Sequence, residues 1–195
     1  MLKWMAPTRE QAWATLTEYT KSEALLRHAL AVEAAVRAYA SKFGEDEELW
    51  GIAGLLHDFD YEIHPTLEQH PQDGAPILRD QGYPEEVVLA ILSHASHTGV
   101  PRETQLQKTV FACDELAGFI HACGLVRPDG IDTLEPKSVR KKLKQPSFAA
   151  RVNREEVYQG AEELGVDLNE HIVFVVAALR PIAAKLGLRT SADGS

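Results

Sequence analysis

The long segment 21–43, which is rich in alanine and leucine, constrains the fold of this chain most strongly. Gly44 follows it directly, and glycine is a common residue just past the end of a helix. The segment therefore predicts a long α-helix. No part of the chain shows a convincing alternation of apolar and polar residues, so no strand is expected. We predict an all-α protein, built as one compact multi-helix bundle.

The rest of the chain divides into shorter apolar segments separated by glycine and proline. Thr8 is expected to cap a first helix over about 9–18. A helix is expected over 46–57, because acidic residues at its beginning favour a helix N-terminus. An irregular stretch is expected at 58–66. Further helices are expected at 67–81, from Pro84 through His94, and at 103–123, 137–144, 153–164 and 168–186, with a loop at 124–136 and an interruption at Pro181.

A chain of 195 residues is long enough for one compact domain. We expect a single domain over 1–187, with its core at about 22–122 and additional C-terminal helices over 137–187. The polar residues 188–195 are expected to form a flexible tail. The last apolar helix fits either the core or an interface between copies, so the sequence leaves a homo-oligomer open.

The charge of the chain limits its partners. The formal net charge of −9 argues against DNA, RNA or an anionic membrane as a partner. No apolar run reaches the ~18 residues of a membrane span, and the N-terminus lacks the apolar core of a secretory signal. The two cysteines, Cys113 and Cys123, lack C-x-x-C spacing and are expected to be reduced. We therefore expect a cytoplasmic protein.

His57 and Asp58 stand side by side at the end of an apolar run that contains glycine. Imidazole and carboxylate groups are good ligands for Fe, Mn, Zn and related divalent ions. Adjacent residues of a regular helix point about 100° apart, so both can reach one ion only near a helix end or bend. His28 and Asp114 would come from two other helices, as in metal sites of helical bundles. The alternative for His28 is an ordinary hydrogen-bonded histidine, whereas a buried Asp114 carboxylate is costly unless it is paired or binds a metal.

The order His28, His57-Asp58, Asp114 resembles that of the HD superfamily of metal-dependent phosphohydrolases. The small and apolar residues that lead up to the doublet in 51–58 are similar to those that precede the His-Asp doublet of the family. Residues 112–116 are similar to the segment that contains the last aspartate of the family. The resemblance covers roughly residues 22–122. It implies an α-helical core in which these four residues bind a divalent metal ion, such as Fe, Mn, Zn, Co, Ni or Mg.

The resemblance leaves open whether one or two ions bind. Some members of the family hold a second metal through additional histidines, and His70 and His94 occupy comparable places here. The sequence departs from that pattern in two respects. Ala95 replaces the second histidine of a His-His pair, and Phe59-Asp60 stands where Ile-Gly would follow the doublet. The alternative is that His70 and His94 line a pocket around a single ion.

A bound divalent ion acidifies water and polarises a phosphoryl oxygen. Hydrolysis of a phosphoester also needs a group that transfers protons and positive charge near the phosphate. Asp60, Glu62 and His94 are the candidates for proton transfer. The alternative for both carboxylates is a solvated loop position. His97 fits either a pocket or an exposed helix end.

Positive charge is concentrated in the segment 137–144, which places five basic residues in eight positions. If this helix folds across the mouth of the pocket, Lys137, Arg140 and Lys141 would bind the substrate phosphate. The alternative is a solvated face, which is the usual role of a run of charges.

The leading hypothesis is a metal-dependent phosphohydrolase that acts on a small soluble phosphate compound, such as a nucleotide. A second hypothesis is an HD-type module that binds a ligand or regulates but no longer catalyses. A third is an oxygenase that uses two irons, which would require both His70 and His94 in the site.

Overall fold

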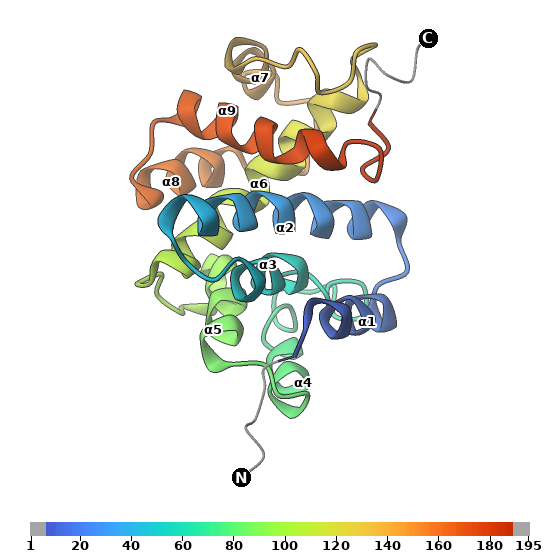
Figure 1. The fold of residues 1–195 in the computed structure, drawn as a ribbon, viewed down its shortest axis with the longest axis vertical. Helices are drawn as coiled ribbons and strands as arrows, with labels where there is room; N and C mark the ends of the chain where they lie inside the picture. The colour runs from blue at the N-terminus through green and yellow to red at the C-terminus, as the bar shows by residue number, and fades with distance from the viewer. Residues whose placement is uncertain (1–6, 189–195) are drawn as a thin grey trace.

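The computed structural model describes residues 7–188, which form α-helices and short 3-10 helices and contain no strand (Figure 1). The prediction of an all-α fold is confirmed. The helices are α1 (Arg9–Tyr19), α2 (Glu23–Phe43), α3 (Glu47–Leu56), α4 (Gly74–Asp80), α5 (Glu85–His94), η1 (Ser96–Thr98), α6 (Gln105–Leu125), α7 (Pro136–Leu143), α8 (Arg154–Leu164), α9 (Leu168–Leu179) and η2 (Arg180–Ile182).

Several helix ends follow directly from the sequence. The Thr8 side chain accepts a hydrogen bond from the backbone N–H of Gln11, whose own side chain bonds back to Thr8, and this capping box begins α1. Thr104 and Gln107 begin α6 in the same way. Helix α2 ends at Gly44, whose φ of 74° is in the left-handed region that favours glycine.

Helices α2 and α6 form the centre of the bundle. Helix α2 packs against α3, α6 and α9, and α6 packs against α5, α8 and α9. In Figure 1, α2 crosses the middle of the molecule, with α1, α3, α4 and α5 below it and α7, α8 and α9 above. The two central helices are thus held from both sides.

The approach of α3 to α2 depends on Gly54. A Cβ atom at this position would lie 3.1 Å from the Cβ of Val36 and 3.2 Å from the Cα of Glu33. Such contacts are tighter than a packed core normally allows, so a larger residue would force the helices apart. The glycine lets α3 lie close to α2 and brings His57, just past the end of α3, toward His28.

Two predicted helices differ from the structure. The helix expected over 67–81 begins only at Gly74, and the residues before it form turns. Pro71 explains the difference, because it has no N–H to donate and disfavours helical geometry at His70. The last helix stops at Leu179 rather than 186, and the interruption predicted at Pro181 takes the form of the 3-10 turn η2.

The flexible tail predicted over 188–195 is contradicted at its first residue. Leu188 was assigned to the flexible tail, but its side chain is buried, and a Cβ on Gly124 would lie 3.0 Å from its Cδ2 atom. Residues 189–195 lie outside the described part of the chain. Within 7–188, none of the helices combines the length and the apolar character needed to cross a membrane. The single domain over 1–187 stays a prediction.

Candidate metal centre

His57 lies at the C-terminal end of α3 and is fully buried. Its Nδ1 atom is 2.8 Å from the backbone oxygen of Gly54. Because a carbonyl oxygen only accepts, Nδ1 carries a hydrogen, and the neutral ring then offers its Nε2 lone pair to a ligand. The local fold therefore fixes both the orientation of this imidazole and its tautomer.

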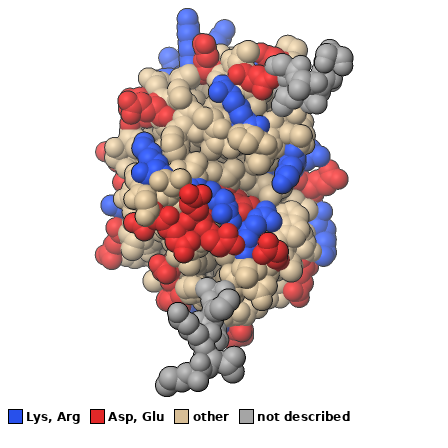
Figure 2. All heavy atoms as spheres, in the orientation of Figure 1, with Lys and Arg blue, Asp and Glu red and all other residues tan. Residues whose placement is uncertain are grey.

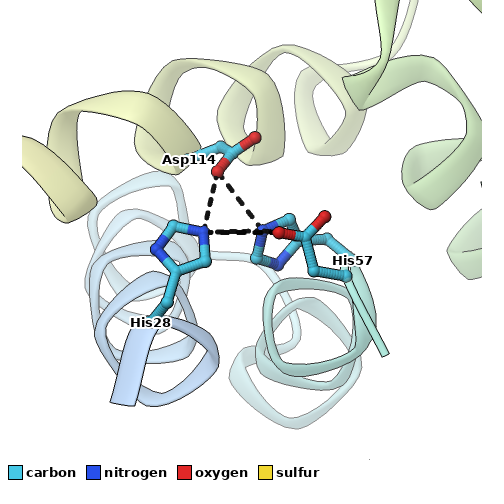
Figure 3. A group of neighbouring side chains, drawn as sticks. His28, His57 and Asp114 are labelled. Atoms are coloured by element: carbon cyan, nitrogen blue, oxygen red, sulfur yellow. Dashed lines mark hydrogen bonds and ion pairs between the residues drawn. The ribbon is translucent and has the colours of Figure 1, made fainter. Parts of the chain in front are cut away.

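Four ligand atoms from three places in the fold meet around His57. His28 projects from α2 and Asp114 from α6, both toward His57 (Figure 3). Asp58 follows His57 directly in the chain. The Nε2 atom of His28 lies 3.1 Å from that of His57 and 3.0 Å from Oδ1 of Asp114. The Oδ2 atom of Asp58 lies 3.3 Å from Nε2 of His57. These atoms all lie within 4.8 Å of one another, and we call these four residues the first group.

A second group shares Asp58 with the first. The other carboxylate oxygen of Asp58, Oδ1, lies 3.1 Å from Nε2 of His70 and 3.3 Å from Nε2 of His94. The ligand atoms of Asp58, His70 and His94 also all lie within 4.8 Å of one another. His70 comes from the turns before α4, and His94 is the last residue of α5. Asp58 thus presents one oxygen to each group, which is the arrangement that two neighbouring ions would need.

Asp60 lies behind His70 and does not line the hollow beside the two groups. It is fully buried, and its Oδ1 accepts a hydrogen bond of 2.8 Å from Nδ1 of His70. Its Oδ2 lies 3.1 Å from Nδ1 of His64. A carboxylate that orients a histidine in this way is a common partner of metal sites. Asp60 thus lies behind a candidate ligand and outside the lining of the hollow, and its role in proton transfer stays a prediction.

Glu62 is also directed away from the site. Its Oε2 atom accepts hydrogen bonds from the backbone N–H groups of Lys21 and Ser22, at 2.8 and 3.0 Å, just before α2 begins. These bonds lower the pKa of Glu62. The structure places this carboxylate at the start of α2 and outside the lining of the hollow, and its role as an acid or base stays a prediction.

The negative charge of the aspartates dominates the ionisation of the first group. Burial alone would lower the pKa of His57, but Asp58 and Asp114 outweigh it and hold that pKa well above its ordinary value. Burial likewise opposes the charge of Asp114, yet the two histidines hold its pKa well below the usual range. The group therefore favours a cation among its ligand atoms. Its imidazole and carboxylate donors fit a divalent ion such as Fe, Mn or Zn.

A hollow of about 600 Å³ opens beside both groups. Its lining includes His94, as expected, and the exposed side chains of Tyr61 and Leu67. His97 also lines it, is exposed, and donates a hydrogen bond of 2.9 Å from Nε2 to the backbone oxygen of His70. A hollow of this size suits a small ligand.

Two carboxyl groups that the sequence did not single out also line the hollow, Glu115 from α6 and Glu156 from α8. Burial and then the charge of Asp114 raise the pKa of Glu115 to about 8, and the same two causes raise the pKa of Glu156. Glu115 directly follows Asp114 in an apolar segment, which could have revealed it. Nothing in the local sequence marks Glu156, which reaches the hollow through the packing of α8 on α6.

The basic helix α7 does not lie over this hollow. Lys137, Arg140 and Lys141 line a separate hollow with Asn169, and the two hollows share no residue. Basic side chains project at the upper end of the molecule in Figure 2, where Figure 1 places α7. The condition set for phosphate binding, that this helix lies across the mouth of the pocket, is therefore not met. Its apolar residues Val139 and Leu143 are buried, which leaves the basic face outward.

The fold and the site define an α-helical protein with a centre of histidine and aspartate ligands suited to divalent metal. Residues 25–118 match the family model of the HD domain. These residues are therefore similar to the HD superfamily of metal-dependent phosphohydrolases, the family that the motifs resemble.

Among curated proteins, the chain is similar to ribonuclease Y from several bacteria. It is 35% identical to that of Lawsonia intracellularis over 103 residues, which cover 52% of this chain and 19% of the relative. It is 33% identical to that of Desulfotalea psychrophila over 95 residues, covering 48% and 18%. The chain thus spans less than a fifth of these relatives. No solved structure matches the chain at a significant level.

Proposed function

We propose that this protein hydrolyses a phosphomonoester or phosphodiester of a small soluble compound, such as a nucleotide. The observation that carries the proposal is Asp58, whose two oxygens face two groups of histidine and aspartate ligands beside a hollow of about 600 Å³. Divalent ions bound there would supply an acidified water and polarise the phosphoryl oxygen.

The residues around the ligands keep the site in one arrangement. The backbone oxygen of Gly54 fixes the ring of His57, and Asp60 fixes that of His70. Such preorganised groups lose little free energy in reorganisation during the reaction. The hollow has the size of an ordinary small-molecule site, and the net charge of −9 opposes the binding of a long polyanion. Both properties support a small substrate.

An RNA phosphodiester is the second candidate, because the relatives that match carry the name ribonuclease Y. The match covers only part of this chain and under a fifth of each relative. The activity of those whole proteins therefore gives a candidate substrate here rather than an assignment. The bond that would break is a phosphoester in both cases, so one experiment can compare the two.

The test is an assay of the purified protein loaded with Mn, Fe, Co or Ni. The substrates are a panel of phosphomonoesters, nucleotides, small phosphodiesters and a short single-stranded RNA. We expect phosphate or alcohol release from a small ester and none from the Asp58→Ala variant. Glu62→Gln is the matched control, since its carboxylate lies nearby in sequence but outside the hollow.

The other outcomes separate the alternatives. Cleavage of RNA alone would select the second candidate. Metal retention without turnover would favour a binding or regulatory module, and iron-dependent oxygen consumption would favour an oxygenase. A protein that turns over nothing with any of these metals, and holds no metal as isolated, would refute the proposed hydrolase.

A further inference from the structure

The loop 144–153, which joins α7 to α8, contributes to the hollow although it lies outside the HD match at 25–118. It places Arg151 and Val152 in the lining, and Arg151 is the one lysine or arginine that lines this hollow in the described part of the chain. We propose that Arg151 binds the substrate phosphate and that Arg154 is the positioning residue of the loop that carries it. The proposal rests on the function proposed above.

Among the described arginines, Arg151 is the one whose guanidinium donates no hydrogen bond to another described residue. Every other arginine within 7–188 donates a hydrogen bond to a side chain or a backbone oxygen. Arg151 is exposed and makes no such bond with any residue of that range. A guanidinium offers several donors in a planar fork that matches two phosphate oxygens. Its donors are therefore available to a ligand in the hollow.

The charges around the hollow explain why a cation is needed there. Asp58 and Asp114 contribute carboxylates to the lining, beside the carboxyl groups of Glu115 and Glu156. Such a site repels a phosphate unless positive charge offsets the carboxylates. Metal ions would offset the ligand aspartates, and Arg151 adds a fixed charge on the substrate side. A phosphate that contacts both would be held in one orientation.

Arg154 holds the loop in shape. Its Nη1 donates to the backbone oxygens of Ala149 and Val152, at 2.9 and 2.7 Å. Its Nη2 donates to the backbone oxygens of Gln145, at 3.2 Å, and Phe148. One side chain thus satisfies four carbonyl groups that span the loop on both sides of Ala149. Ala149 has a φ of 44°, an unfavourable conformation for a residue with a Cβ, which such a network can maintain.

The same loop is attached to the helix that carries Asp114. The backbone N–H of Asn153 donates to Oε2 of Glu115 at 3.1 Å, and the ring of Phe148 packs edge-on against Phe119 of α6 at 5.5 Å. Arg151 therefore projects from a loop that is tied to α6 at two places. This fixes the backbone that carries Arg151 relative to the metal ligands, and a positioned donor is what phosphate recognition requires.

The first test measures Arg151 by two readouts on the Mn-loaded protein. The readouts are the hydrolysis of p-nitrophenyl phosphate and the calorimetric titration of inorganic phosphate. We expect Arg151→Ala to raise both KM and the phosphate Kd by about tenfold, the size of one charge-assisted contact, with a smaller change in kcat and unchanged metal content. Arg151→Lys should recover part of the loss. Arg140→Ala is the control, because it removes the same charge from the separate hollow.

The second test asks whether Arg154 acts through Arg151. We expect Arg154→Ala to raise KM while metal content stays unchanged. The double variant Arg151→Ala, Arg154→Ala should have the same KM as Arg151→Ala. Once Arg151 is absent the loop no longer contacts the phosphate, so a change in the shape of the loop has no further effect on KM. A purely structural role for Arg154 would instead lower the kcat and metal content of the double variant below those of Arg151→Ala.

The outcomes distinguish failure of this inference from failure of the proposed function. If the wild type hydrolyses an ester and Arg151→Ala keeps its KM and phosphate Kd, the inference is overturned and the hydrolase stands. If no ester is hydrolysed, the phosphate titration still decides. A wild type that binds no phosphate, or a Kd that is unchanged in Arg151→Ala, then overturns the role of Arg151 as well.

Discussion

Asp60 does not face the hollow, yet it orients one of the candidate metal ligands, His70. Its carboxylate accepts the Nδ1–H of His70 at 2.8 Å, so Nε2 of that ring stays free toward Asp58. Replacement of such outer partners typically weakens metal binding by about 10–100-fold. We therefore expect Asp60→Asn to weaken the binding of one ion by about that factor and to leave the ion at His57 unaffected. Titration with a competing chromophoric chelator measures both affinities.

Glu62→Gln is the control for Asp60→Asn. Its carboxylate bonds only to the backbone at the start of α2, so metal affinity should match that of the wild type. Equal metal affinities in the wild type and Asp60→Asn would refute the role given to Asp60. Equal losses in both variants would point to a general loosening of the fold instead.

His171 makes the stability of the protein sensitive to acid. It is fully buried, its Nε2 donates to the backbone oxygen of Ala112 at 2.9 Å, and its Nδ1 accepts from the hydroxyl of Tyr39 at 2.7 Å. Burial lowers its pKa to about 4, against about 6.5 in an unfolded chain. The unfolded state therefore takes up a proton first as pH falls. The stability that this neutral ring provides is complete above pH ~6.5 and is lost toward pH 4.

We expect the free energy of unfolding to decrease by about 2 kcal/mol between pH 7.5 and pH 5 through His171 alone. His171→Gln keeps a donor and an acceptor but no proton to gain, so it should show a smaller decrease over that range. Urea denaturation of both proteins at the two pH values measures the difference. The same pH dependence in both would show that other groups cause it.

At the scale of single residues, the sequence predicted which residues could act as ligands better than it predicted the direction in which side chains face. His28, His57, Asp58 and Asp114 follow a recognisable order along the chain, and the fold brings their ligand atoms together. Asp60 and Glu62 were expected in the hollow because they are close to the doublet in sequence. Which side of a turn a carboxylate faces depends on its hydrogen-bond partners. Those partners, such as His70 and the start of α2, come from other parts of the chain.

The contact between α6 and α8 depends on Gly160. A Cβ atom there would lie 2.7 Å from the Cα of Ala112, which is backbone and cannot rotate away. We expect Gly160→Ala to decrease the free energy of unfolding by about 1–2 kcal/mol, because overpacking outweighs the better helix propensity of alanine. Urea denaturation measures this change. The neighbouring exposed Gln159 is the control, and Gln159→Ala should change stability by no more than about 0.5 kcal/mol. A Gly160→Ala protein as stable as the wild type would refute the close contact.

At the scale of helices, capping residues and glycines predicted most ends, whereas the placement of a helix in the bundle was not predictable. Thr8, Gly44 and Pro181 each mark a boundary by their own chemistry. Pro71 delays the start of α4 to Gly74, later than the start at residue 67 that the sequence predicted. The location of α7 depends on which neighbours bury Val139 and Leu143. Long-range packing of this kind leaves no local pattern in the sequence.

At the scale of the molecule, the candidate metal ligands connect elements that are distant in the chain. They come from α2, the end of α3, the turns before α4, the end of α5, and α6. Helices α8 and α9 pack on α6 and α2 from the other side. The site is thus completed only when these elements are assembled together. A ligand that binds this assembled site and not the unfolded chain must stabilise the whole bundle.

We therefore expect removal of metal by a chelator to lower the Tm of the protein. Ions at 100 times their Kd would stabilise the fold by about 2.7 kcal/mol, which corresponds to about 5–10 °C for a chain of this size. Scanning calorimetry of the chelated and the Mn-loaded protein measures the shift. Asp58→Ala should show no shift, because both groups lose their shared ligand. Arg140 belongs to α7 and lines a separate hollow, so Arg140→Ala should keep the full shift in Tm. Equal Tm values for the chelated and loaded wild type would mean that these histidines and aspartates bind no metal in the folded protein.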